Sequence, residues 1–329
     1  MRKLLQCLVF LISALLVSPA SGSQAPHPKA EGLSPDAPAY ARHGPYWVGT
    51  RDLAFQPDPG ADLAFQATLW YPAWNPQRMD EAGASAHGIP GAPPDPSAAP
   101  YPLVVFVHGW TGIPSRHSYH LARLASHGFV VLGVHYRSSF LPSLIRQSID
   151  FAARLNEPGA PLANLIDPGH VAVEGYSLGG QVTLQLGGAC AVGMPPGGAQ
   201  DPRVKAILVI APAMFPLEDW NVGGIKLPSL VMLGQQDTDV LPLEVGKQLY
   251  ESLPAAQKSL VVFLGYDHYF FIEPPEYPGT REENRLGDLL SHFATAFLLS
   301  TLKGEAQARQ ALLPGAASFK EVQYATTLK

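Results

Sequence analysis

Apolar residues along this 329-residue chain recur in two alternating patterns. Short continuous apolar runs are typical of strands covered on both faces of a parallel sheet, and they lie at 103–107, 129–134, 171–173, 204–210, 229–233 and 260–264. Between them, apolar residues at helical spacing predict helices over 118–127, 144–155, 178–186, 243–253 and 286–302. Strands that alternate with helices predict an α/β fold, a mostly parallel, twisted sheet with helices on both faces.

The segments that flank this alternation have a different composition. Apolar and aromatic residues over 46–55 and 63–71, around a turn signal at 58–60, predict an opening hairpin, whereas Pro and Gly make 74–102 a loop. We predict one folded domain over 44–302 with no large lid domain, preceded by a disordered lead-in over 23–43. A C-terminal tail over 303–329 is expected to pack on that domain as a short helix and irregular chain.

The first residues have the order of a secretory signal peptide. Arg2 and Lys3 precede an apolar run over 4–17, and small residues follow it over 18–22. We therefore predict a signal peptide over 1–22 and a secreted or periplasmic mature protein. The apolar run is too short to span a bilayer, so no stable membrane insertion is expected after the signal is removed. Cys7 leaves with the signal, and Cys190 is expected to be a small, buried apolar residue.

Composition and charge exclude several classes of partner. The 47% hydrophobic content supports a substantial core, and a formal net charge of −5 offers no basic surface for nucleic acid. The histidines show no metal-ligand spacing with cysteine or carboxylate, and no nucleotide-binding glycine motif follows a strand. We expect a monomer that holds no metal and no cofactor.

The segment VAVEGYSLGG, 171–180, predicts a strand, a sharp turn and a helix, with Ser177 on the turn. Gly175 and Gly179 lie two residues on either side of Ser177, where small neighbours let the helix pack against the strand. Serine is a weak nucleophile at neutral pH, so this interpretation requires a base, an acid that orients the base, and donors for an oxyanion.

Residues that meet these requirements follow other predicted strands, at the sheet edge where sites form in open parallel sheets. After 103–107 the backbone N–H of Trp110, together with that of Leu178, can face a developing oxyanion. After 229–233 either Asp237 or Asp239 can serve as the acid, and after 260–264 His268 is the candidate base.

The order of serine, acid and histidine is that of the α/β-hydrolases, and the chain resembles this superfamily over about 44–302. The motifs VVFVHGWTG, VAVEGYSLGG, LGQQD and GYDH resemble bacterial relatives of platelet-activating-factor acetylhydrolase, dienelactone-hydrolase-like proteins and cutinase-like polyester hydrolases. The resemblance implies Ser177 as nucleophile, His268 as base, and Trp110 and Leu178 as oxyanion donors. Its spacing of 31 residues from 237 to 268 favours Asp237 over Asp239 as the acid.

This resemblance implies a secreted serine hydrolase that cleaves carboxylic esters with short to medium acyl or aryl groups, either small or polymeric. The alternatives are a cutinase-like polyester hydrolase or lipase, a thioesterase or peptidase with the same residues, and a non-catalytic binding protein on this fold. Tyr176 stands where relatives commonly carry His or Trp. We expect Tyr176, Tyr269 and Trp220 to contact an apolar substrate.

Overall fold

The computed structural model describes residues 28–55, 65–75, 87–136, 142–194, 199–214, 216–238, 240–272 and 279–329. The predicted signal peptide and Asp239, the alternative acid, lie outside these described residues.

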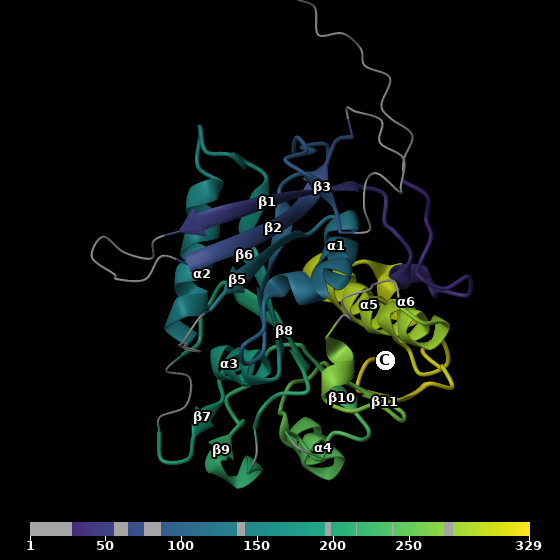
Figure 1. The fold of residues 1–329 in the computed structure, drawn as a ribbon. Coiled ribbons are helices and arrows are strands. Elements are labelled where there is room, and N and C mark those ends of the chain that lie inside the picture. The colour runs from purple at the N-terminus through teal and green to yellow at the C-terminus, as the bar shows by residue number, and fades with distance from the viewer. Residues whose placement is uncertain are drawn as a thin grey trace, which may run out of the picture.

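One twisted sheet forms the centre of the molecule (Figure 1). Its strands among the described residues are β1 Trp47–Phe55, β2 Phe65–Ala73, β3 Ile89–Pro90, β4 Tyr101–Val107, β5 Val130–His135, β6 Ile166–Tyr176, β8 Val204–Ile210, β10 Ser229–Gly234, β11 Lys258–Phe263 and β12 Val322–Thr326. They lie in the order β12-β11-β10-β8-β6-β4-β5-β2-β1-β3. From β5 through β4, β6, β8 and β10 to β11 every neighbouring pair is parallel, while β2 and β12 add antiparallel strands at the two flanks. The predicted α/β fold with a mostly parallel sheet is confirmed.

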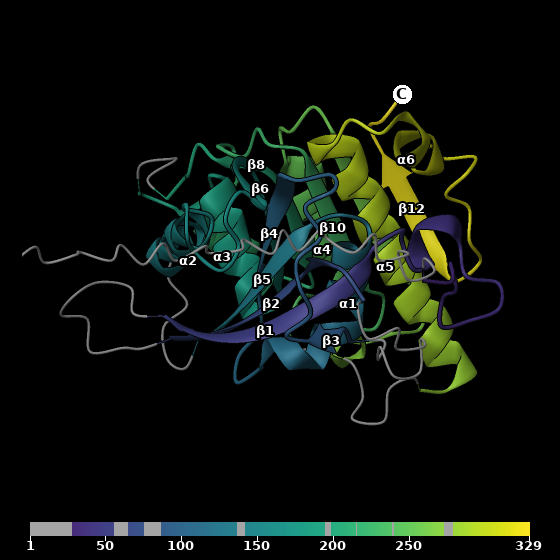
Figure 2. The ribbon, with the colours of Figure 1, turned by 90° about the horizontal axis from the view of Figure 1, so that it is seen from above.

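Helices cover both faces of this sheet, as Figure 2 shows from above. They are α1 Ser118–Ser126, α2 Pro142–Leu155, α3 Leu178–Gly187, α4 Leu243–Ser252, α5 Arg281–Leu302 and α6 Ala306–Ala311. Helices α2, α3 and α4 pack on one face, whereas α1 and α5 pack on the other and α6 packs against α5. Alternate residues of β6 divide between the two cores: Val171 and Val173 join the first, and Ala172 and Tyr176 join the second.

The N-terminal segment differs from its prediction. Residues 28–43, expected to be disordered, pack against α5 through the 3₁₀ helix η1 Ala39–Ala41, and Ala37 and Ala41 are buried. The backbone N–H of Ser34 donates to the buried carboxylate of Asp288 at 2.7 Å. A buried carboxylate needs donors, and this segment supplies them, so it is ordered despite its loop-like composition.

The C-terminal tail is also more regular than expected. Its last strand, β12, pairs antiparallel with β11, so the prediction of irregular chain after a short helix is wrong and the sheet extends beyond residue 302. Helix α5 begins five residues earlier than predicted because Thr280 and Glu283 form a capping box at its start. The predicted loop over 74–102 contains β3 and the first residues of β4.

The segment between β8 and β10 contributes short elements that lie outside the main sheet. The described residues between β8 and β10 form only the 3₁₀ helix η3 Leu217–Asp219 and the strand β9 Trp220–Asn221, which pairs with β7 Cys190–Ala191. Cys190 is therefore a half-exposed strand residue rather than the buried one predicted from its neighbours. No described helix is both long enough and apolar enough to cross a membrane.

Candidate active site

Ser177 lies on a turn between β6 and α3 that leaves no space for larger neighbours. Its φ of 56° is in the left-handed region, which non-glycine residues rarely adopt. A Cβ on Gly175 would collide with the carbonyl oxygen of Gly179, and a Cβ on Gly179 would collide with that of Val107. We call residues 175–179 the nucleophile turn. Because its backbone is in direct contact with neighbouring backbone, this turn accepts only glycine at positions 175 and 179.

His268 joins Ser177 to Asp237. Its Nε2 lies 2.9 Å from the hydroxyl oxygen of Ser177, and its Nδ1 lies 2.7 Å from Oδ2 of Asp237. All three side chains are buried, with 9%, 4% and 2% of the surface of Ser177, His268 and Asp237 exposed. The structure therefore brings the three predicted residues into one hydrogen-bonded chain, although 91 residues separate the first from the last.

The environment of Asp237 favours its ionised form. Burial raises the pKa of this carboxyl. The hydrogen bonds from His268 and from the backbone N–H groups of Val240 and Leu241 lower it by more than burial raises it, so the net shift of the pKa is downward. An ionised Asp237 accepts the Nδ1 proton of His268 and leaves Nε2 free to accept a proton from serine.

The two predicted oxyanion donors lie beside the nucleophile in the backbone. Leu178 is the first residue of α3, where the N–H group has no intrahelical acceptor. Trp110 follows Gly109, and a Cβ on Gly109 would lie 3.0 Å from the Cβ of Ser177. The indole of Trp110 is 72% exposed. The residue before Trp110 therefore lies against the Ser177 side chain, and Leu178 follows Ser177 directly in the chain.

A match to a family of known proteins agrees with this geometry. A family model described as PET hydrolase-like matches residues 57–276. This chain belongs to the PET hydrolase-like family. It is a serine ester hydrolase with the α/β-hydrolase fold, and the prediction of a carboxylic ester hydrolase is confirmed.

Individual relatives of this PET hydrolase-like chain are cutinases. This chain is 26% identical over 311 residues to Cutinase cut1 of Thermobifida fusca, and the match covers 91% of this chain and 79% of that protein. It is 25% identical over 301 residues to Cutinase 2 of Thermobifida cellulosilytica, covering 88% and 92% of the two chains. Cutinase est2 of Thermobifida alba is 26% identical over 259 residues, covering 75% of this chain and 71% of the relative.

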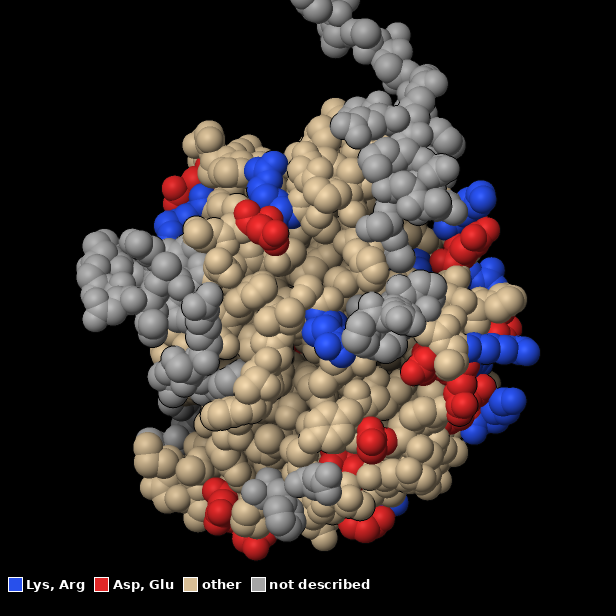
Figure 3. All heavy atoms as spheres, in the orientation of Figure 1, with Lys and Arg blue, Asp and Glu red and all other residues tan. Residues whose placement is uncertain are grey.

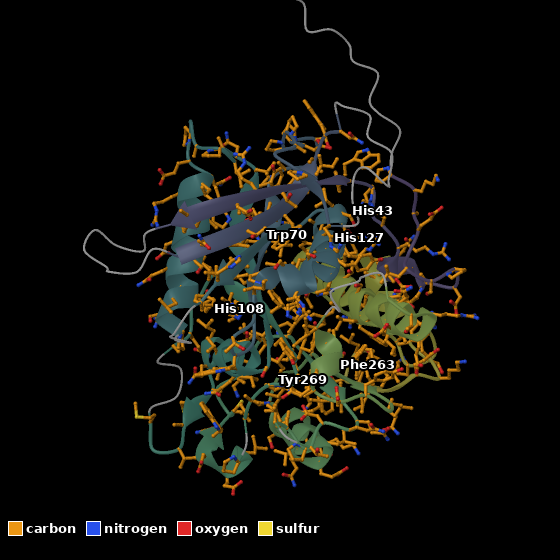
Figure 4. The ribbon with its side chains drawn as sticks, viewed as in Figure 1. His43, Trp70, His108, His127, Phe263 and Tyr269 are labelled. Carbon is orange, nitrogen blue, oxygen red and sulfur yellow. The ribbon has the colours of Figure 1, made fainter. Side chains whose placement is uncertain are left out.

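The three residues expected to contact substrate occupy different environments. Tyr269, labelled in Figure 4, is 61% exposed. Its ring meets that of His268 edge-on, with the centroids 5.5 Å apart. Tyr176 is buried behind His268, and its hydroxyl donates to the backbone carbonyl of His268 at 2.9 Å. Trp220 is half-buried in β9 against the α2–α4 core, and none of the described contacts joins it to Ser177, His268 or Asp237. Of the three, the structure brings only Tyr269 to the exposed side of the base.

Sequence patterns did not reveal several buried polar residues below the site. The carboxylate of Glu174, on β6, accepts a hydrogen bond from Nε2 of His120 at 2.7 Å, and Nδ1 of His120 lies 3.3 Å from the hydroxyl of Ser291. His117 is also buried. The period-two pattern of β6 places Glu174 on the same face as Tyr176, but only the tertiary structure supplies its partner on α1. Within the described ranges no three His, Cys, Asp or Glu residues gather to hold a metal ion.

Proposed function

We propose that Ser177 is the nucleophile, His268 the general base and Asp237 the acid of this ester hydrolase. The single observation that carries the proposal is the continuous hydrogen-bonded chain from Asp237 through His268 to Ser177. His268 removes the Ser177 proton as the hydroxyl attacks the ester carbonyl, and the N–H groups of Trp110 and Leu178 stabilise the oxyanion. His268 then protonates the leaving alcohol, and water repeats the cycle on the acyl-enzyme.

We further propose that the substrates are uncharged esters with short to medium acyl or aryl groups. The exposed rings of Trp110 and Tyr269 support this choice. Figure 4 places Tyr269 in the lower middle of the view, and the surface drawn there in Figure 3 carries few charged side chains.

A polyester is the second candidate substrate. Its support is the family match, the cutinase relatives, and two aromatic side chains that stand exposed rather than enclosed under a lid. Because residues 1–22 resemble a secretory signal peptide, we propose that the enzyme acts outside the cytoplasm. We also propose that it is a monomer.

Hydrolysis of p-nitrophenyl esters from acetate to palmitate tests the proposal. We expect short and medium chains to be turned over, and Ser177→Ala and His268→Ala to lose about 10⁴-fold or more in kcat. Ser148→Ala, which alters a buried serine on α2, is the matched control and should retain activity. A fluorophosphonate probe should label the wild type and not Ser177→Ala, whereas a non-catalytic binding protein would stay unlabelled. Release of aromatic products from a polyester film tests the second candidate.

A further inference from the structure

The segment that carries His268 lies beside empty space. We call residues 265–272 the base loop; it contains the 3₁₀ helix η4 Tyr269–Phe271. A cavity of about 300 Å³ lies along it, lined on the loop side by Gly265, Tyr266, Asp267, Tyr269, Phe270 and Ile272 and on the far side by α1 and α5 residues such as His120 and Leu290. On its other side Phe271 is buried in the core that α1 and α5 form, and Phe270 packs against that core, so the loop is packed on one side and borders the cavity on the other.

Besides Asp237, two further buried polar side chains hydrogen-bond to the base loop. The hydroxyl of Tyr176 donates to the backbone carbonyl of His268, and the two rings lie with their centroids 5.1 Å apart. His117, in the 3₁₀ helix η2 Pro114–His117, makes a hydrogen bond to the backbone of Phe271. The rings of His117 and Tyr176 are themselves 5.6 Å apart. The loop is thus held near both ends of η4 by one packed pair of side chains.

The attachment through Tyr176 also links the base to the nucleophile. Tyr176 is the last residue of β6 and precedes Ser177 in the nucleophile turn. A closed path therefore runs from the Ser177 hydroxyl to the His268 imidazole, from the His268 carbonyl to the Tyr176 hydroxyl, and along one peptide bond back to Ser177. Any movement of the base loop away from β6 lengthens the distance between the Ser177 and His268 side chains.

We propose that Tyr176 and His117 are positioning residues that hold His268 at hydrogen-bonding distance from Ser177. The proposal rests on the proposed function, in which His268 is the general base. Neither side chain touches the reacting atoms. Tyr176 acts from behind the imidazole, whereas its place next to Ser177 in the sequence predicted a contact with substrate. Burial lowers the pKa of His117 to about 3, with the neighbouring His120, His108 and Arg116 adding to this effect, so His117 stays neutral at ordinary pH.

Removal of a single hydroxyl tests the proposal, and the chain offers a matched control. Tyr71, on β2, is equally buried, and its hydroxyl donates to the backbone carbonyl of Ala92 at 2.8 Å. Tyr176→Phe and Tyr71→Phe therefore each delete a bond from a buried hydroxyl to a backbone carbonyl, and Tyr71→Phe also removes a hydrogen bond with Arg51. We expect similar falls in Tm for both, but only Tyr176→Phe should lower kcat, by roughly tenfold to 100-fold, with KM within about twofold of the wild type.

Amide hydrogen exchange supplies a measurement that does not depend on catalysis. Exchange in residues 265–272 should be faster in Tyr176→Phe and in His117→Phe, and unchanged in Tyr71→Phe. Because both donors hold one loop, the double variant should lose less in kcat than the product of the two single losses.

The outcomes separate the two proposals. Wild-type kcat in Tyr176→Phe, or unchanged exchange in the base loop, would overturn the positioning role while His268→Ala remains inactive. Equal losses in kcat for Tyr176→Phe and Tyr71→Phe would also overturn it, because a general loss of stability would then explain both. Wild-type activity in His268→Ala would instead overturn the proposed function itself.

Discussion

The nucleophile turn and the base loop meet at one hydrogen bond but are held in different ways. In the nucleophile turn, backbone contacts backbone so closely that neither Gly175 nor Gly179 can carry a Cβ. In the base loop, a Cβ on Gly265 would meet no atom within 4 Å, and a cavity borders the segment. The serine is thus placed by close backbone contacts, whereas the histidine is placed by side-chain hydrogen bonds together with the packing of Phe271 in the core. Substitutions in the nucleophile turn should therefore lower mainly the free energy of unfolding. Substitutions in the base loop should change mainly the distance between the Ser177 and His268 side chains.

The largest expected effect is on the hydrogen bond between Asp237 and His268. Asp237→Asn should lower kcat by about 10⁴-fold, because an amide does not stabilise the imidazolium that forms and can leave His268 in the wrong tautomer. The asparagine carbonyl can still accept from the backbone of Val240 and Leu241, so folding should be preserved. Asp267→Asn is the control in the base loop, since in the described contacts the Asp267 carboxylate accepts from the backbone N–H groups of Tyr269 and Phe270 and makes no hydrogen bond to the His268 imidazole. Equal kcat values for the two variants would contradict Asp237 as the acid.

The buried pair below the nucleophile turn should come next. His120→Leu leaves the fully buried carboxylate of Glu174 without its partner, and Oε2 of Glu174 already has none among the described residues. We expect a loss of about 3–5 kcal/mol in the free energy of unfolding, measured by urea denaturation. His170→Leu removes the exposed pair with Asp167 and should change it by less than about 1 kcal/mol. A small effect at position 120 would contradict this prediction, because it would show that Glu174 finds a different partner.

A pair of glycine substitutions compares the two regions directly. Gly179→Ala forces the nucleophile turn apart at the carbonyl of Val107 and should cost up to about 3 kcal/mol of stability. Gly265→Ala adds a Cβ in open space and meets only the strain of a φ of 83°, roughly 1–2 kcal/mol. Urea denaturation measures the stability of each variant. Labelling of Ser177 with the fluorophosphonate probe should show a smaller reactive fraction of the protein in Gly179→Ala than in Gly265→Ala. The reverse order would contradict the distinction between the two regions.

The smallest expected effect, counted for one histidine over one pH unit, is the acid sensitivity of the side that carries the base loop. Burial lowers the pKa of His117 to about 3 and that of His292, on α5, to about 4, with nearby cationic groups such as Arg285 contributing to the latter. In the unfolded chain both titrate near 6.5, so below that pH the unfolded state binds protons that the folded state does not. Stability should therefore fall as the pH drops from 6.5 towards 4, by about 1.4 kcal/mol per pH unit for each histidine.

Urea denaturation between pH 7 and pH 4.5 measures this slope. The lowered pKa of Asp237 acts only below its ordinary value of 3.8, outside this window. His292→Phe should reduce the dependence of the free energy of unfolding on pH by about 1.4 kcal/mol per pH unit, because it removes one group that stays neutral in the folded state. An unchanged slope would show that His292 is protonated in the folded protein without cost.

Much of the fold followed from the sequence because its signals are local. The apolar run at 204–210 predicts β8 with both ends correct, and the other central strands are within three residues at their starts apart from β6. β6 begins at Ile166, before a polar stretch over 167–170 that hides its first residues from a search for apolar runs. The segments at 28–43 and 322–326 were not predicted as ordered structure, because their partners, Asp288 and β11, are remote in sequence.

The sequence by itself determined which residues can perform the chemistry and the strand ends at which they lie. A serine between glycines after a strand, an aspartate and a histidine each occur at a strand end, and in a parallel sheet those ends share one edge. Only the tertiary structure decided how the side chains around them are used. It placed Tyr176 behind His268, Trp220 in a strand that pairs with β7, and a cavity beside the base loop. These outcomes depend on how separate elements pack across a face of the sheet, and spacing along one chain does not specify that packing.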